Sequence, residues 1–203
     1  MGSAEVALIV VAIVAVAVLV LVSLARRLDR LHRREATSRA TLEAQLVRRA
    51  EAAIAVAESG ILDPAGALIV ADAGWRAAVE SERLVGEDTV GEHSVAAAEA
   101  RGLVESELTR ALRGALGAES DQRRIAEDPD GVALLARLAH HAYRVQLARR
   151  FHNDAVVQIR HIRRSPVIRA FRLAGRAPMP RPFEMDDALD VLDPTAPSAG
   201  PPS

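Results

Sequence analysis

One stretch of the chain carries side chains suited to acid–base or hydrolytic chemistry: Arg149, His152, Asn153 and Asp154. Histidine and carboxylate groups are the usual proton donors and acceptors of hydrolases. On a helix, Arg149 would lie next to Asn153, and Arg150 next to Asp154, because residues four apart share a face. Polar groups at mid-helix also fix the register of packed helices or hold a passing segment. We favour this structural role and keep a ligand site or a hydrolase as the alternative.

Three other histidines are candidates for a metal site: His140, His141 and His161. Adjacent histidines on a helix point about 100° apart and chelate one ion poorly. On one helix, His141 and His161 would stand roughly 30 Å apart, so a single ion cannot join them. The chain has no cysteine and no H-E-x-x-H motif. The sequence therefore predicts no metal ion and no cofactor.

Motifs of several common enzyme and nucleic-acid-binding classes are missing. There is no G-x-S-x-G, no G-x-x-x-x-G-K-[ST] and no G-x-G-x-x-G. Arg34-Glu35 is followed by the residues ATSR, which departs from the R-E-x-x-E-E core of a pyrophosphohydrolase. One Trp, one Tyr and three Phe cannot line a stacking surface, and a net charge of −1 attracts no nucleic acid. We expect neither an enzyme nor a nucleic-acid-binding protein.

The composition favours helices. Half of the residues are hydrophobic, yet only 2% are aromatic, and every basic residue is an arginine. The strands of a sandwich or barrel favour aromatic and β-branched residues, whereas this chain is poor in aromatic residues and rich in Ala, Val, Leu and Arg. The sequence therefore predicts an all-α fold, with an N-terminal transmembrane helix followed by an elongated antiparallel helical bundle.

Residues 6–25, VALIVVAIVAVAVLVLVSLA, have the length and composition of a membrane span. At 1.5 Å per residue they match a hydrocarbon core of about 30 Å. A signal peptide, the alternative, would carry basic residues before the apolar segment, where this chain has only Glu5. Arginines follow the segment directly, at Arg26, Arg27, Arg30, Arg33 and Arg34. Because basic residues stay on the cytoplasmic side, we expect a single-pass cell-membrane protein with its N-terminus outside and its C-terminal domain in the cytoplasm.

The chain divides into three expected parts: an anchor over 1–25, a bundle over 26–184 and a disordered, acidic, Pro-rich tail over 185–203. The first helix should run on from the anchor to Gly60. Asp63-Pro64 then opens a second helix, with Leu68, Trp75 and Val79 on one side.

Two further long helices are expected, over 94–116 and over 131–165, with residues 118–130 as a loop. A short helix over 167–174 should lead into a proline-rich extended strap that ends at Phe183-Glu184. The longest helix should bury one stripe, made of Leu135, Leu138, Ala142, Val145, Ala148, His152, Val156, Ile159 and Ile162.

Charge lies in opposite blocks. Residues 61–128 hold 7 Arg against 14 acids, and residues 129–183 hold 11 Arg against 2 acids. The simpler interpretation is neutralisation between neighbouring helices, which aids solubility and register. The functional interpretation is a basic face for anionic lipid or an acidic partner. That face would comprise Arg160, Arg163, Arg164, Arg169, Arg172 and Arg176.

The segment LARRFHNDAV at 147–156 and the later Pro182-Phe183-Glu184 resemble the LemA family, which carries an A-R-x-F-Y-N-D-A-V-like run and a closing F-E. A membrane helix followed by Gln-Leu-x-Arg-Arg, here residues 45–49, is also similar to that family. The resemblance implies an elongated antiparallel bundle held at a membrane, with no established enzymatic activity.

The chain departs from the LemA pattern at several positions and resembles a divergent member. Arg39 stands where the family usually has Trp, and residues 53–55 stand where it has Ile/Leu-Pro-Asn. Ala142 replaces a frequent Glu, and His152 replaces the usual Tyr.

These features predict a membrane-anchored, non-enzymatic scaffold or adaptor. The expected partners are membrane lipid, an unidentified protein and a second copy of the chain. The alternative is a membrane-surface sensor that binds anionic lipid through the arginine-rich C-terminal helix, and a hydrolase ranks third. Candidate structural or interaction residues are Arg149, His152, Asn153, Asp154, Phe183 and Glu184.

Overall fold

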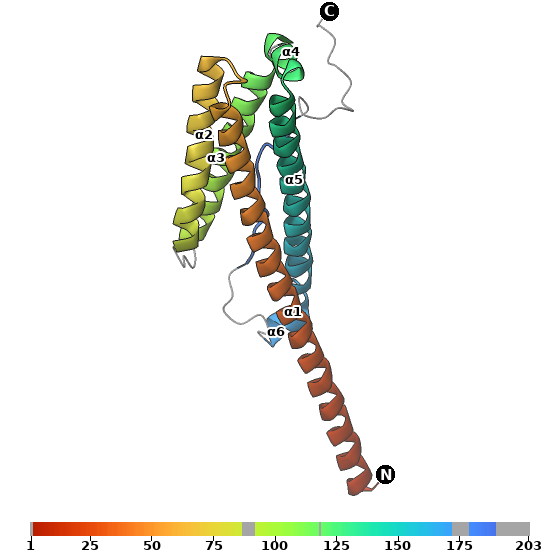
Figure 1. Ribbon diagram of the computed structural model, residues 1–203. Coiled ribbons are helices and arrows are strands. Elements are labelled where there is room, and N and C mark those ends of the chain that lie inside the picture. Colours follow the sequence, from red (N-terminus) through yellow and green to blue (C-terminus); the bar gives the residue numbers. More distant parts are fainter. Residues whose placement is uncertain (1, 87–91, 118, 172–178, 190–203) are drawn as a thin grey trace, which may run out of the picture.

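The computed structural model describes residues 2–86, 92–117, 119–171 and 179–189, and in these ranges the chain forms helices and no strand (Figure 1). The predicted all-α class is confirmed. The helices of the described ranges are α1 (Ser3–Glu58), α2 (Pro64–Gly86), α3 (Glu92–Leu116), α4 (Glu119–Glu127), α5 (Pro129–Arg163) and α6 (Pro166–Ala170).

Helix α1 changes character along its 56 residues. Its N-terminal part projects from the bundle (Figure 1), and Leu8 and Leu19 there are 73% and 68% exposed. Its C-terminal part lies in the bundle, where Leu46, Ala50 and Ala53 are fully buried. The projecting part makes α1 long and apolar enough to cross a membrane.

The bundle is built from four antiparallel helices in the order α5, α1, α2 and α3 (Figure 1). Helix α1 packs on both α5 and α2, and α3 packs on α2. Small residues at the meeting faces let the helices approach closely. The main core includes Ala50, Ala53, Val56, Val70, Ala73, Ala77, Leu108, Leu112 and Leu138.

The predicted helix boundaries have clear local causes. Gly60 adopts a φ of 79° directly after α1, a conformation that ends a helix and favours glycine. Asp63 caps α2, because its Oδ1 accepts hydrogen bonds from the backbone N–H groups of Ala65 and Gly66 at 2.9 and 3.1 Å. Asp128 caps α5 in the same way, and Pro129 occupies the first turn.

Two expectations about the helices need correction. Residues 119–127, expected as part of a loop, form α4, because Ile125 is buried in the core and Arg124 Nε donates to the Ile61 carbonyl at 3.1 Å. Helix α5 ends at Arg163, two residues before the expected end, because Pro166 already opens α6.

The side of α2 that carries Leu68, Trp75 and Val79 is exposed. The opposite side, which includes Val70 and Ala77, is fully buried. Alanines and a glycine on the buried side allow close packing between helices, for which a tryptophan is too large. The apolar spacing therefore predicted the helix but not its buried face.

A strap, defined here as residues 179–189, lies in extended form along the bundle. The expected disordered tail over 185–203 needs correction for its first five residues, which pack on the bundle. Leu189 is 6% exposed and belongs to the main core, and Met185 packs beside Phe183. Residues 190–203 of the expected tail lie outside the described residues.

Candidate functional site

The strap lies between α3 and α5, which pack on α2 and α1 rather than on each other. Phe183 is its main apolar anchor. Its ring packs in a cluster with side chains from α1 and α5: Leu42, Leu46, Val145 and Ala148. We call the surface of α1, α3 and α5 that holds the strap the strap groove.

Helix α5 holds the strap through Arg149 and Asn153. The Asn153 side chain accepts a hydrogen bond from the Phe183 N–H at 2.8 Å and donates one to the Phe183 carbonyl at 3.2 Å. Arg149 forms a bidentate pair with Asp187, with Nε–Oδ2 and Nη2–Oδ1 distances of 3.0 Å. A paired guanidinium–carboxylate contact is among the stronger polar interactions in proteins.

Helix α3 holds the other edge of the strap through Ser106, Thr109 and Arg113. Ser106 Oγ accepts from the Asp186 N–H at 2.9 Å, and Thr109 Oγ1 donates to the Asp186 carbonyl at 2.7 Å. Arg113 pairs with the Asp186 carboxylate at 2.9 Å and donates to the Ala188 carbonyl at 2.8 Å. The strap therefore joins α3 to α5.

Gly102 marks the closest approach between α3 and the strap. A Cβ at this buried position would collide with the backbone carbonyl oxygen of Glu184. Gly102→Ala should displace the strap, lower the thermal unfolding midpoint and speed proteolysis within residues 179–189 severalfold. The matched control is Gly114→Ala on the same helix, where a Cβ meets nothing within 4 Å. That substitution should stabilise α3 by up to about 1 kcal/mol, and an equal loss of stability in both variants would contradict the prediction.

His152 lies on α5 against both α1 and the strap. It is 5% exposed, and its Nδ1 stands 3.5 Å from Ser38 Oγ. Burial lowers the pKa of His152 below its ordinary value of 6.5, although Glu35 and a hydrogen bond to the Arg181 backbone act in the opposite direction. His152 therefore favours its neutral form in the folded protein.

The His152 pKa leads to a prediction about pH. Because the folded-state pKa lies below the unfolded value, the unfolded chain takes up the proton first as pH falls. Stability should be fully present above about pH 6.5 and should decline below it. His152→Gln should make the unfolding midpoint less dependent on pH between 7 and 5, and the same substitution at exposed His161 on the same helix is the matched control. His141, whose pKa burial also lowers, should contribute to the slope that remains.

A buried charge network lies beneath the strap and was not predicted from the sequence. Arg49, Arg101 and Glu105 are each exposed by 1% or less. Glu105 forms ion pairs with both arginines, at 2.8 Å to Arg101. Arg49 also donates to Thr109 Oγ1 at 3.0 Å, and Glu43 lies 3.6 Å from Arg101. Through Thr109 the network reaches the strap backbone.

Burial raises the pKa of Glu43, although Arg101 and Arg39 favour its ionised form and Glu105 opposes it. The network therefore brings two buried arginines together with two carboxylates, of which Glu43 is partly exposed. Its parts come from α1 and α3, far apart in the sequence. The Gln-Leu-x-Arg-Arg run contains Arg49, but it does not indicate which residue pairs with Arg49.

Two contacts fix the register of α1 against α5. Ser38 lies opposite His152, and Arg144 Nε donates to Gln45 Oε1 at 3.1 Å. The two helices are antiparallel and rise equally per residue. Residue 30 lies eight positions before Ser38 on α1, and residue 160 lies eight positions after His152 on α5. The two positions are therefore level with each other along the bundle.

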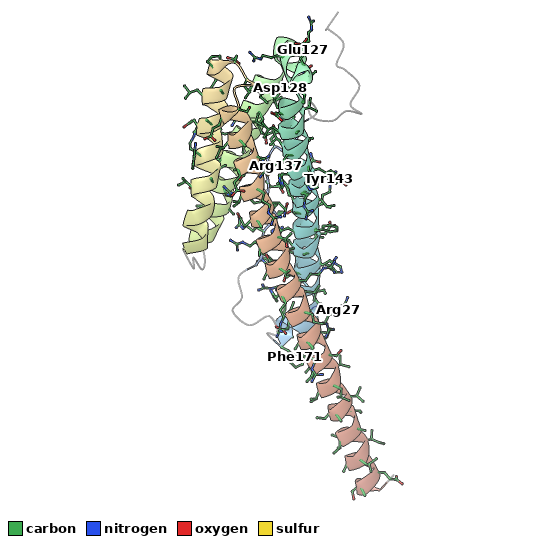
Figure 2. All side chains as sticks on the ribbon, in the orientation of Figure 1. Arg27, Glu127, Asp128, Arg137, Tyr143 and Phe171 are labelled. Carbon is green, nitrogen blue, oxygen red and sulfur yellow. The ribbon has the colours of Figure 1, made fainter. Side chains whose placement is uncertain are left out.

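An arginine collar results from this register at the base of the projecting helix. Buried Leu28 and Ile168 lie in the same part of the molecule, on α1 and α6. Figure 2 labels Arg27 on this stretch of α1. The collar consists of Arg26, Arg27, Arg30, Arg160, Arg163 and Arg164.

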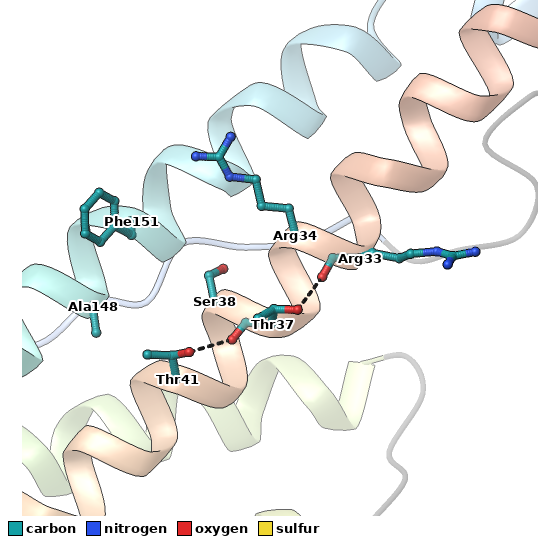
Figure 3. A pocket seen from close by; sticks show the side chains of 7 residues that line it. All are labelled: Arg33, Arg34, Thr37, Ser38, Thr41, Ala148 and Phe151. Atoms are coloured by element: carbon teal, nitrogen blue, oxygen red, sulfur yellow. Dashed lines mark hydrogen bonds between the residues drawn. The ribbon is translucent and has the colours of Figure 1, made fainter.

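An open groove of about 420 Å³ lies along α1 and α5 (Figure 3). Arg33, Arg34, Thr37, Ser38, Thr41, Ala148 and Phe151 line it. Thr37 and Thr41 donate to the carbonyls four residues earlier, and Ser38 donates to the Glu35 carbonyl. Because these hydroxyl groups donate their protons to backbone carbonyls of α1, the groove walls present mainly carbon atoms.

The predicted site residues lie in different environments. Arg149, His152, Asn153 and Phe183 come together at the strap groove. The expected contact between Arg149 and Asn153 does not form, because both side chains bind the strap. Asp154 is exposed. Glu184 is exposed as well, and its backbone meets α3. Among the described residues, no three His, Cys, Asp or Glu side chains gather as a metal site would require.

Comparisons with protein-family models, with curated proteins and with solved structures find no match for this chain.

Proposed function

We propose that this protein is a single-pass, membrane-anchored helical scaffold, with its N-terminus outside and its bundle in the cytoplasm. The observation that carries the proposal is the continuity of α1, whose exposed apolar part leads into the buried part without a break. An apolar surface of this length is stable only when lipid or protein covers it. The arginines that follow it favour the cytoplasmic side.

The proposal also treats the chain as a divergent relative of the LemA family. The run 147–156 and Phe183-Glu184 support this relation, since Asn153 within the run binds the backbone of Phe183. The two parts of the resemblance are thus in contact in the fold.

Membrane fractionation of full-length protein with a C-terminal tag tests the scaffold proposal. The protein should stay in the membrane pellet at high salt and high pH, and external protease should leave the tag intact in whole cells. A matched variant with Val11→Arg and Val18→Arg should lose the anchor, because each arginine costs roughly 2.5 to 3.5 kcal/mol at the centre of a span. Wild-type protein in the soluble fraction would contradict the proposal.

A second candidate function is recognition of anionic lipid by the arginine collar. Its supporting observation is the register that brings arginines of α5 level with those directly after the apolar segment. Each basic residue near an anionic surface contributes about 1 kcal/mol of attraction.

Mass spectrometry of lipids that co-purify with the full chain tests this second function. Phosphatidylglycerol should be retained over phosphatidylcholine at low salt and lost as salt rises, since screening shortens the reach of surface charge. Replacing Arg26, Arg27, Arg30 and Arg164 with Gln should abolish that preference. Replacing Arg137 and Arg150, which are exposed elsewhere on α5, should preserve it. Equal retention of both lipids by the wild-type chain would exclude the collar as a lipid site.

A further inference from the structure

The strap groove recognises the backbone of an extended segment. Asn153 binds both the N–H and the carbonyl of Phe183. Ser106 and Thr109 bind the N–H and the carbonyl of Asp186. Paired side-chain contacts of this kind hold an extended peptide irrespective of its side chains, as in many peptide-binding proteins.

Side-chain contacts then define which segment fits the groove. The ring of Phe183 enters the apolar cluster, and Leu189 enters the main core. The carboxylates of Asp186 and Asp187 meet arginines on opposite walls of the groove. The groove therefore selects the pattern Phe-x-x-Asp-Asp-x-Leu.

The groove walls are held together independently of the strap. Helix α1 contacts α5 and α2, and α2 contacts α3, so the four helices form a connected bundle without residues 179–189. The strap adds side-chain hydrogen bonds, ion pairs and apolar contacts, but no backbone ladder to a helix within the described residues. A segment held in this way can be exchanged for another of the same pattern.

We propose that the strap groove is a binding site for an extended acidic peptide, and that a second copy of this chain supplies that peptide by exchange of straps. The pattern occurs in the chain itself at residues 183–189. The exchange rests on the proposed membrane anchor, because anchored copies share one orientation and place their straps and grooves at the same height. Such an exchange of identical elements is a common route to dimers.

A labelled peptide tests the groove itself. The probe is a fluorescent synthetic peptide of residues 181–190, and the receptor is the full chain in detergent with Phe183→Ala and Asp187→Asn in its own strap. The peptide should bind saturably, and at least tenfold more tightly than to the wild-type chain, whose own strap competes. Adding Asn153→Ala and Arg149→Gln to the receptor should weaken binding by at least tenfold, as should Phe→Ala in the peptide.

The peptide test gives a clear negative result as well. If the receptor keeps the helical circular dichroism of the wild type and binds no peptide, or if the groove substitutions change nothing, the proposal is wrong. Should the double strap variant fail to fold, Asp187→Asn alone replaces it as the receptor. Peptide binding in detergent does not depend on whether α1 spans a membrane in cells. Failure of the membrane-anchor proposal is therefore distinguishable from failure of the groove proposal.

Complementation identifies the source of the peptide. A full chain with a weakened strap is mixed with one that has a weakened groove but an intact strap, both reconstituted in lipid nanodiscs large enough for two copies. Energy transfer between labels on the two chains should be at least fivefold higher than the transfer in nanodiscs that hold two copies of the groove variant. If the peptide binds but the mixed pair shows no excess transfer, exchange between copies is overturned and the strap of the same chain remains the occupant of the groove.

Discussion

Replacing Glu105 with glutamine should lower the free energy of unfolding by about 3 to 5 kcal/mol. The carboxylate lies between two buried arginines, Arg49 and Arg101, and glutamine removes the negative charge that pairs with both guanidinium groups. The loss should appear in denaturant unfolding of the full chain in detergent, as a lower midpoint at an unchanged slope.

A matched control for the Glu105 variant is Glu107→Gln on the same helix. Glu107 also pairs with an arginine, Arg76, at 3.1 Å, but its side chain is 42% exposed. Exposed pairs contribute about 0 to 1 kcal/mol. A triple variant with Glu105→Leu, Arg49→Met and Arg101→Met should recover most of the stability that Glu105→Gln loses, because apolar groups of similar size tolerate burial. A similar loss in both single variants would contradict this account.

Leu46→Ala should cost about 2 to 5 kcal/mol of unfolding free energy. Leu46 is fully buried on α1 and packs in the cluster that holds Phe183. Its removal opens a cavity beneath the strap anchor, so the strap should loosen as the bundle loses stability. Leu103→Ala on α3 is the control, since Leu103 is 65% exposed and its truncation should change stability by less than about 0.5 kcal/mol. Thermal and denaturant unfolding of both variants would settle the comparison.

The stripe of α5 was the most predictable part of the fold. Seven of its nine members are buried, and Leu135 and Ile162 are half-buried. The spacing of threes and fours is sufficient here because α5 packs one face along a single partner, α1. Helix α2 differs, since alanines rather than its largest apolar residues form its contact face.

The partners of the polar residues could not be predicted from the sequence. Local spacing suggested that Arg149 would meet Asn153 within α5, yet both bind the strap. Arg49 and Glu105 are 56 positions apart and meet only because α1 and α3 come into contact in the bundle. Helical periodicity reports which face is apolar but carries no information on which distant charge will lie opposite.

The unbroken course of α1 gives the molecule a mechanical property. A helix of 56 residues is about 84 Å long, and the 33 residues after position 25 span roughly 50 Å. Helices in bilayers tilt readily with local thickness, and a change of about 10° at the lipid would swing the far end of this rod by about 9 Å. Because the other helices are fastened along the rod, the proposed membrane anchor would make the whole assembly a lever whose fulcrum is the bilayer surface.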